Sequence, residues 1–159
     1  MLILIDTREQ LPYQFIDKDC TTEVCTLTVG DYSLPGLTDK VAIERKSLDD
    51  LINCFMGPNR DRFEKELQKL RYYEVAVVII EGNQTDILKG SYTSQMLPQS
   101  AMETISAFYI RYRVPFLFCS DRSGGERMTF SLLQKYYYEI ERRYKNMKKT
   151  LKETTCEIP

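Results

Sequence analysis

The chain of 159 residues contains no histidine, which excludes nucleophile schemes and metal sites that depend on an imidazole. Long apolar runs are also missing, because the longest, residues 2–5 and 75–80, are too short to cross a membrane. No secretion signal is recognisable, so we expect a cytoplasmic protein. The five cysteines are odd in number and irregularly spaced, which indicates reduced thiols and no ordinary zinc-ligand pattern. Chemistry must therefore come from carboxylates, Lys, Arg, Tyr or Cys.

The balance of charge changes along the chain. Residues 1–58 contain 5 basic and 10 acidic residues, whereas residues 121–152 contain 9 basic and 4 acidic residues. The acidic excess suits a cation site, and the basic excess suits a surface that meets phosphates. Composition alone favours the simpler interpretation of the basic segment, a solvated helix face.

Alternation of buried strands with helices predicts an α/β domain with a mixed central sheet. The expected strands, rich in apolar and β-branched residues, are 2–5, 22–29, 41–43, 75–80 and 115–119. The expected helices, with apolar residues at helical spacing, are 48–56, 60–73, 98–113 and a last one from about residue 123 to 150. We expect a single domain over residues 1–152, followed by a short tail at 153–159.

Local signals refine these expectations. Ser47 is the expected N-cap of the first helix, and Ser123 with Glu126 fits a capping box for the last one. Gly57-Pro58-Asn59 is expected to interrupt the helical structure between the first and second helices. Residues 82–98 are expected to form a loop. The packed stripe predicted for the last helix consists of Leu133, Tyr137, Ile140, Tyr144 and Met147.

The strand at 41–43 leads into the residues best suited to chemistry. Because alternate side chains of a strand share a face, Glu44 and Lys46 point the same way, about 7 Å apart. Small Ala42 on that face is expected to leave room for a ligand. The short turn that follows Gly30-Asp31 predicts a hairpin that brings Asp31 close to Glu44.

Two carboxylates beside a lysine suit phosphodiester cleavage. Carboxylates hold Mg²⁺ or Mn²⁺, which acidifies a water, and a lysine orients the nucleophile and offsets developing charge. Taken singly, Gly-Asp is a common turn and Glu-Arg-Lys a common charged strand end. The combination is more specific than either fragment.

Three segments resemble the nuclease domain of the XPF family of structure-specific endonucleases. They are Ile5-Asp6-Thr7-Arg8-Glu9, Gly30-Asp31-Tyr32 and Glu44-Arg45-Lys46-Ser47-Leu48-Asp49-Asp50. The family signature is G-D, a variable gap and E-R-K-x-x-x-D, preceded by a V/I-D-x-R-E strand. The similarity continues through Arg62-Phe63 and residues 75–81. The resemblance implies a restriction-endonuclease-like PD-(D/E)xK core, with helices flanking the mixed sheet, and a DNA endonuclease that uses Mg²⁺ or Mn²⁺.

The resemblance also implies roles for individual residues. Asp31 and Glu44 are the implied principal metal ligands, helped by the main-chain carbonyl of Arg45. Asp6 is implied as a further catalytic and metal-binding carboxylate at the edge of the site, and Lys46 as the catalytic lysine. Arg8 and Arg45 are implied to contact phosphate or brace the acids, and Asp50 to tether Arg45 or Lys46. Glu9 is a further supporting residue. For Asp50, favourable charge at a helix N-terminus is an equal alternative.

DNA is the expected partner. The basic residues expected to meet its backbone are Arg60, Arg62, Arg142, Arg143, Lys145, Lys148 and Lys149. Among the neighbouring tyrosines, Tyr137 is expected to pack, while base stacking stays open for Tyr136 and Tyr138. A homodimer or a partner protein is a further expectation. The apolar helix over Ala101 to Ile110, with Phe108 and Tyr109, is the expected pairing face, unless these residues cover the sheet instead.

Members of the family that cut branched DNA usually carry tandem helix-hairpin-helix modules, which we do not find in this sequence. The chain therefore resembles the compact stand-alone domains of bacterial or phage type, for which a cytoplasmic or nucleoid-associated place is expected. A role in DNA repair or recombination is implied. The opposing hypothesis is a non-catalytic DNA-binding scaffold or partner subunit, although Asp31, Glu44 and Lys46 are all present. Cleavage of RNA or of single strands stays open.

Overall fold

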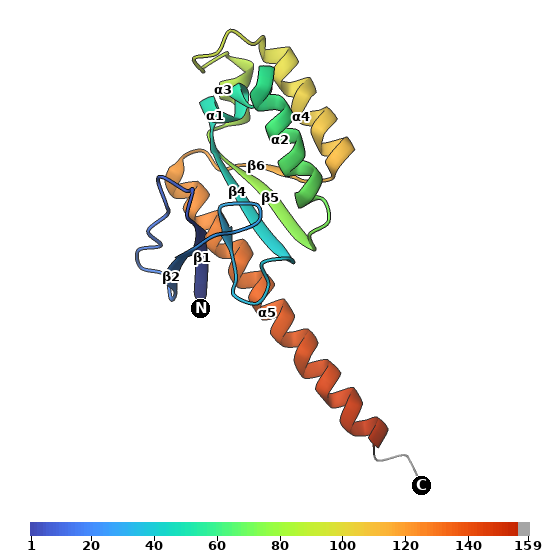
Figure 1. Cartoon of the computed structure of the whole chain (residues 1–159). Coiled ribbons are helices and arrows are strands. Elements are labelled where there is room, and N and C mark those ends of the chain that lie inside the picture. Colours follow the sequence, from blue (N-terminus) through green and yellow to red (C-terminus); the bar gives the residue numbers. More distant parts are fainter. Residues whose placement is uncertain (156–159) are drawn as a thin grey trace.

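The computed structural model describes residues 1–155, whose strands form one mixed six-stranded sheet between helices (Figure 1). The strands are β1 (Leu2–Asp6), β2 (Thr21–Cys25), β3 (Tyr32–Ser33), β4 (Val41–Ser47), β5 (Val75–Glu81) and β6 (Phe116–Phe118). The helices are α1 (Leu48–Asn53), α2 (Gly57–Leu70), α3 (Gln84–Leu88), α4 (Pro98–Tyr112) and α5 (Arg122–Thr155). The mixed α/β architecture confirms the predicted fold class.

The strand order β2-β1-β3-β4-β5-β6 places β4 inside the sheet. The short β3 runs antiparallel to β1 and β4, whereas the other neighbouring strands are parallel. The first four residues of β4 are buried and its last three are half-buried. The Glu-Arg-Lys segment therefore leads from the buried part of β4 to its more accessible C-terminal end.

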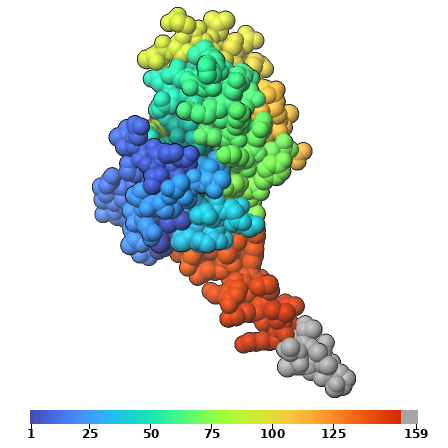
Figure 2. Space-filling view, in the orientation of Figure 1, coloured from blue at the N-terminus to red at the C-terminus, as the bar shows by residue number. Residues whose placement is uncertain are grey.

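Side-chain alternation along the strands divides the core between the two faces of the sheet. On one face, Ala42, Val78 and Ile80 pack with residues of α1, α2 and α4. On the other face, Ile43 and Ile79 pack with residues of β1, β3 and α5. Figure 1 shows that α5 crosses this second face, and both Figures 1 and 2 show that it then extends well beyond the body of the molecule.

The strand predicted over 22–29 is wrong beyond residue 25. β2 ends at Cys25 and lies at the edge of the sheet, parallel to β1. Its continuation is diverted because the N–H of Leu27 donates to Asp6 Oδ2 at 2.6 Å instead of to a strand. The hairpin partner of β4 is β3, in which Tyr32 pairs with Ile43, so the pairing strand follows Asp31 rather than preceding it.

Three features of the helices differ from the prediction: the end of α1, the start of α2 and the presence of α3. Ser47 caps α1 as predicted, with its Oγ accepting a hydrogen bond from the N–H of Asp50 at 3.1 Å, but α1 ends at Asn53. The break predicted at residues 57–59 is wrong, because α2 begins at Gly57 and Pro58 fits the first helical turn. The segment 82–98, predicted as a loop, contains α3.

The start of α5 is set by Asp121 rather than by the predicted capping box. Asp121 Oδ1 accepts a hydrogen bond from the N–H of Gly124 at 2.7 Å, which is the N-cap arrangement. Ser123 instead accepts from Arg127. The helix continues to Thr155, so the tail predicted for 153–159 begins within α5, and residues 156–159 lie outside the described residues.

The packed stripe of α5 is also partly wrong. Leu133 is buried and Ile140 half-buried, as predicted, whereas Tyr144 and Met147 are exposed because α5 has left the body there. Tyr137, expected to pack, is exposed, whereas the neighbouring Tyr136, for which base stacking stayed open, is buried. No helix within residues 1–155 is long and apolar enough to span a membrane.

Candidate active site

Gly30 and Asp31 approach β4 through a turn that glycine alone fits. Gly30 has a φ of +81°, and a Cβ at this position would lie 3.0 Å from the Cβ of Ala42. Ala42, expected to leave room for a ligand, therefore leaves room for Gly30. The N–H of Asp31 donates to the carbonyl of Ile43 at 2.8 Å, and Asp31 Oδ2 accepts from the N–H of Arg45 at 2.7 Å. These bonds hold the Asp31 carboxylate against β4.

Glu44 and Lys46 lie on one face of β4, as strand alternation predicts. Lys46 Nζ donates to Glu44 Oε1 at 2.7 Å, and the two side chains are only 12% and 7% exposed. Burial alone would favour the neutral amine, but the Glu44 carboxylate raises the pKa of Lys46 above its ordinary value. The site therefore holds a protonated lysine beside an ionisable carboxylate.

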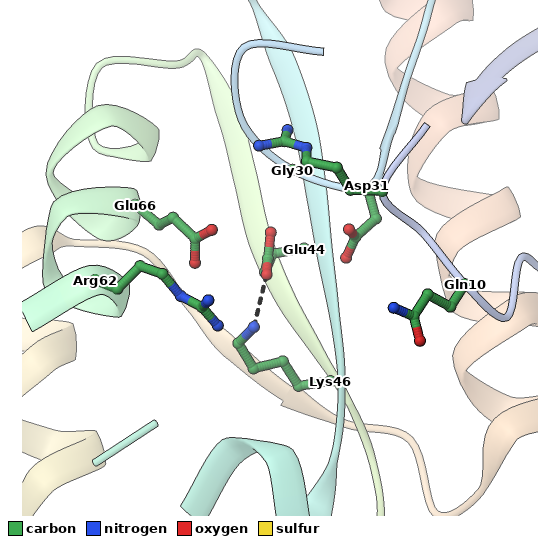
Figure 3. Close-up of a pocket in the computed structure, with 8 residues that line it drawn as sticks. Gln10, Gly30, Asp31, Glu44, Lys46, Arg62 and Glu66 are labelled. Atoms are coloured by element: carbon green, nitrogen blue, oxygen red, sulfur yellow. Dashed lines mark hydrogen bonds and ion pairs between the residues drawn. The ribbon is translucent and has the colours of Figure 1, made fainter. Parts of the chain in front are cut away.

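A cavity of about 370 Å³ brings the predicted residues together (Figure 3). The residues that line it, from the chain after β1, the turn before β3, β4 and α2, are Arg8, Gln10, Gly30, Asp31, Glu44, Lys46, Arg62 and Glu66. Sequence reasoning missed Gln10 and Glu66. Glu66 lies one helical turn after Arg62 on α2, and that spacing is the signal that could have identified it.

The carboxylates of this cavity perturb one another. Burial, followed by the negative charge of Glu44, raises the pKa of Asp31 to about 8. The same two causes raise the pKa of Glu66. Within residues 1–155, no three His, Cys, Asp or Glu residues lie close enough to hold a metal ion by themselves. A cation at Asp31 and Glu44 would relieve their repulsion and would complete its coordination with other ligands.

Asp6 is buried and is not among the residues that line the cavity. Its Oδ1 accepts a hydrogen bond from Arg8 Nε at 2.6 Å, and its Oδ2 accepts from the N–H of Leu27 at 2.6 Å. Burial opposes ionisation of this carboxyl, yet the bonds from Arg8 and Leu27 keep the pKa of Asp6 below its ordinary value. The arrangement directs Arg8, whose side chain is 63% exposed, to the cavity rim.

The Arg45 side chain belongs to a buried ion-pair network. Its Nε and Nη2 each donate to Glu81 at 2.8 Å, and its Nη1 lies 3.3 Å from Glu9 Oε1. Arg122, in the first turn of α5, also contacts Glu81 at 3.4 Å. The hydrogen bonds to Glu81 raise the pKa of Arg45. Of the two roles implied for Arg45, this geometry favours bracing the site.

Asp50 lies in the first turn of α1. Its Oδ2 accepts a hydrogen bond from Ser47 Oγ at 2.6 Å, and its N–H bonds back to the same hydroxyl. Its side chain makes no hydrogen bond or ion pair with Arg45 or Lys46. The helix N-terminal role of Asp50 is therefore the one that its contacts favour.

The residues predicted to bind DNA do not lie together. Arg62 lines the cavity, but Arg60 pairs with Glu64 at 2.9 Å and stacks over the ring of Phe108. The five predicted residues of α5 lie on the part that extends beyond the body (Figure 1), and they are Arg142, Arg143, Lys145, Lys148 and Lys149. Two of these, Arg142 and Arg143, pair with Glu139.

The expected pairing face on α4 is only partly accessible. Phe108 is fully buried and packs edge-on against Phe55 in the core, so it covers the sheet. Tyr109 and Ile110 are exposed, at 52% and 76%. The part of α4 available to a partner is therefore Tyr109 and Ile110, not Phe108.

The fold is that of the XPF nuclease domain. One structure of XPF from Aeropyrum pernix superimposes with a TM-score of 0.67 at 18% identity, over 86% of this chain and 61% of that chain. Another, of the same protein in complex with DNA, gives a TM-score of 0.67 at 19% identity, over 87% of this chain and 66% of that chain. The predicted restriction-endonuclease-like core, a mixed sheet flanked by helices, is confirmed.

Residues 5–132 match the family model described as the ERCC4 domain, and the chain belongs to this family. The 3′-flap repair endonuclease Xpf of Saccharolobus solfataricus is 34% identical over 91 residues, 55% of this chain and 36% of that protein. The protein named "Putative ATP-dependent RNA helicase MJ1505" of Methanocaldococcus jannaschii is 31% identical over 100 residues, 60% of this chain and 12% of that protein. The chain thus spans only a minor part of these relatives.

Proposed function

We propose that the protein is a divalent-metal-dependent DNA endonuclease that hydrolyses phosphodiester bonds at branched or flap DNA, in repair or recombination. The observation that carries this proposal is the convergence of Asp31, Glu44 and Lys46 in one cavity, with Lys46 Nζ 2.7 Å from Glu44. Membership of the ERCC4-domain family and the likeness to a 3′-flap repair endonuclease support it.

The donor set fits Mg²⁺ or Mn²⁺. Asp31 Oδ1 and Glu44 Oε2 accept no hydrogen bond from the described residues, so both oxygens are available to a cation. Mg²⁺ is typically held by one or two carboxylates and keeps several waters, which suits this pair, with the carbonyl of Arg45 as a further proposed ligand. When bound, the metal supplies an acidified water and polarises the scissile phosphate.

The remaining residues of the cavity would bind and position the substrate. Lys46, protonated beside Glu44, orients the attacking water and offsets the negative charge that develops on the phosphate. Arg8 and Arg62 offer guanidinium groups to the phosphates on either side. Asp6 acts through Arg8, which it holds by two side-chain hydrogen bonds.

The test is cleavage of labelled duplex, 3′-flap, fork and single-stranded DNA, and of an RNA strand, with Mg²⁺ or Mn²⁺. Asp31→Asn and Glu44→Gln nearly preserve shape, and each should lower cleavage at least about a hundredfold because the site would lose a metal ligand. Binding of DNA without metal should persist, since both changes remove negative charge. Asp61→Asn, which removes an exposed carboxylate on α2, is the control and should cleave normally.

Two results would contradict the proposal. Wild-type protein that binds DNA but cuts none of these substrates would favour the non-catalytic scaffold or partner subunit. Folded Asp31→Asn or Glu44→Gln protein that cleaves at the wild-type rate would remove these carboxylates from the metal site.

A further inference from the structure

Glu66 is a third carboxylate of the candidate active site that the proposed reaction has not used. It lies on α2, whereas Asp31 belongs to the turn before β3 and Glu44 to β4. Figure 3 shows the Glu44 carboxylate between those of Asp31 and Glu66, with the Glu66 side chain directed into the same cavity. Three acidic groups from three different segments therefore converge there.

The Glu66 carboxylate makes no hydrogen bond or ion pair with residues 1–155, even though cations line the same cavity. On α2, Arg60 and Glu64 form the ion pair expected for opposite charges four residues apart, at 2.9 Å. Arg62 and Glu66 have the same spacing on the same helix, yet no hydrogen bond or ion pair joins them. No described residue donates a hydrogen bond to Glu66. The Glu66 oxygens can therefore accept hydrogen bonds from molecules bound in the cavity.

We propose that Glu66 accepts hydrogen bonds from water bound to the divalent cation of this site, and so strengthens cation binding without touching the metal. The inference rests on the proposed function. A direct oxygen ligand lies about 2.1 Å from Mg²⁺, whereas a bound water extends the reach of the site by about 2.7 Å. Action through water agrees with the finding that no three acidic groups in residues 1–155 can hold one ion directly. Glu66 is thus a positioning residue.

The experiment measures Mn²⁺ binding to the metal-free full chain without DNA, from the electron paramagnetic resonance signal of free Mn²⁺. Partners that orient metal ligands typically change affinity by 10- to 100-fold, so Glu66→Gln should raise the Kd about tenfold. Glu66→Asp keeps the charge on a shorter side chain and should lose less affinity than Glu66→Gln. Glu44→Gln, which removes a direct ligand, should raise the Kd at least about a hundredfold.

A matched control separates a hydrogen bond in the cavity from a general effect of charge. Glu64→Gln removes the same charge from the same helix, but Glu64 contacts Arg111 and Tyr112 outside the cavity, so the Kd should stay unchanged. Repeating the titrations at about 0.3 M salt weakens long-range electrostatics. The difference between Glu66→Gln and wild type should persist there.

The outcomes separate this inference from the proposed function. If Glu66→Gln binds Mn²⁺ like wild type while Glu44→Gln does not, the inference is overturned and the metal site stands. If Glu66→Gln and Glu64→Gln weaken binding equally, or the effect disappears in salt, Glu66 acts only as a distant charge and the inference is again overturned. If Glu44→Gln binds like wild type, the proposed metal site itself fails. Melting temperatures without Mn²⁺ verify folding, and Glu66→Asp carries the test if Glu66→Gln does not fold.

Discussion

Replacement of Asp31 by asparagine should stabilise the metal-free protein at pH 8. The change removes a negative charge that is held beside Glu44 in a half-buried position. The asparagine oxygen can still accept the Arg45 N–H, which now lies 2.7 Å from Asp31 Oδ2. The substitution therefore removes repulsion while leaving the local hydrogen bond in place.

The magnitude and its sign follow from the pKa of Asp31. Folding raises this pKa from 3.8 to about 8, chiefly through burial and then through Glu44. One pKa unit corresponds to about 1.4 kcal/mol, so a carboxyl titrating alone would cost about 6 kcal/mol. Asp31 shares its protons with neighbouring carboxylates, and the cavity is open to water. We therefore expect Asp31→Asn to raise the free energy of unfolding by about 2 kcal/mol.

The unfolded chain loses this proton near pH 4, whereas the folded chain retains it up to about pH 8. Over that window the folded state binds more protons than the unfolded state, so the stability of the wild type falls as the pH rises. The advantage of Asp31→Asn should therefore be about 1 kcal/mol at about pH 4.5 and should reach its full size, about 2 kcal/mol, near pH 8.

The assay is thermal and urea unfolding of both proteins in a chelator, at about pH 4.5 and pH 8. A difference of about 2 kcal/mol corresponds to a Tm higher by about 4 to 8 °C for a chain of this length. Asp61→Asn should differ from wild type by less than about 0.5 kcal/mol at either pH. Added Mn²⁺ should raise the Tm of the wild type and not that of Asp31→Asn. The prediction is wrong if Asp31→Asn is no more stable than the wild type at pH 8, or if it is stabilised by the same amount at both pH values.

Further predictions concern the frame of the site and the outer surfaces. Gly30→Ala should lower the free energy of unfolding by about 2 to 4 kcal/mol, because its φ is positive and its Cβ would meet Ala42; unchanged urea unfolding would contradict this. Glu81→Gln should cost about 3 kcal/mol by weakening the buried pair with Arg45, and a neutral effect in the same assay would show that the network is dispensable. Charge reversal of three basic residues of α5 should weaken binding to all DNA substrates alike and lower the salt slope by about one per lost contact, with turnover at saturating DNA unchanged. These residues are Arg142, Lys145 and Lys149. Equal slopes for wild type and variant would instead place the DNA path at the cavity. If α4 forms a pairing face, Tyr109→Glu should convert a dimer into a monomer by light scattering; monomeric wild type at high micromolar concentration would exclude the face.

Features that depend only on neighbours along the chain could be predicted from the sequence. Two-residue alternation places Glu44 and Lys46 on one face of β4 without any knowledge of the rest of the sheet. Apolar runs and helical spacing indicated a mixed α/β domain, and the spaced motifs around Asp31 and Glu44 indicated the family, which the match over residues 5–132 shows. Ser47 as a helix cap was equally local, because an N-cap bonds within its own first turn.

The partner that each of these residues meets across the sheet depends on how distant segments pack together. Arg45 could be expected to brace or to contact phosphate, and only the position of Glu81 on the neighbouring β5 directs it to bracing. Glu66 belongs to the site because the fold brings α2 to the same cavity as β4 and the turn before β3. The sequence of α2 does not specify this placement. The same holds for α5: helical spacing defines a stripe, but the stripe is buried only as far as the body extends, so Leu133 is covered and Tyr144 is not. Burial and pairing between distant residues depend on strand order and helix docking, and these are properties of the folded chain as a whole.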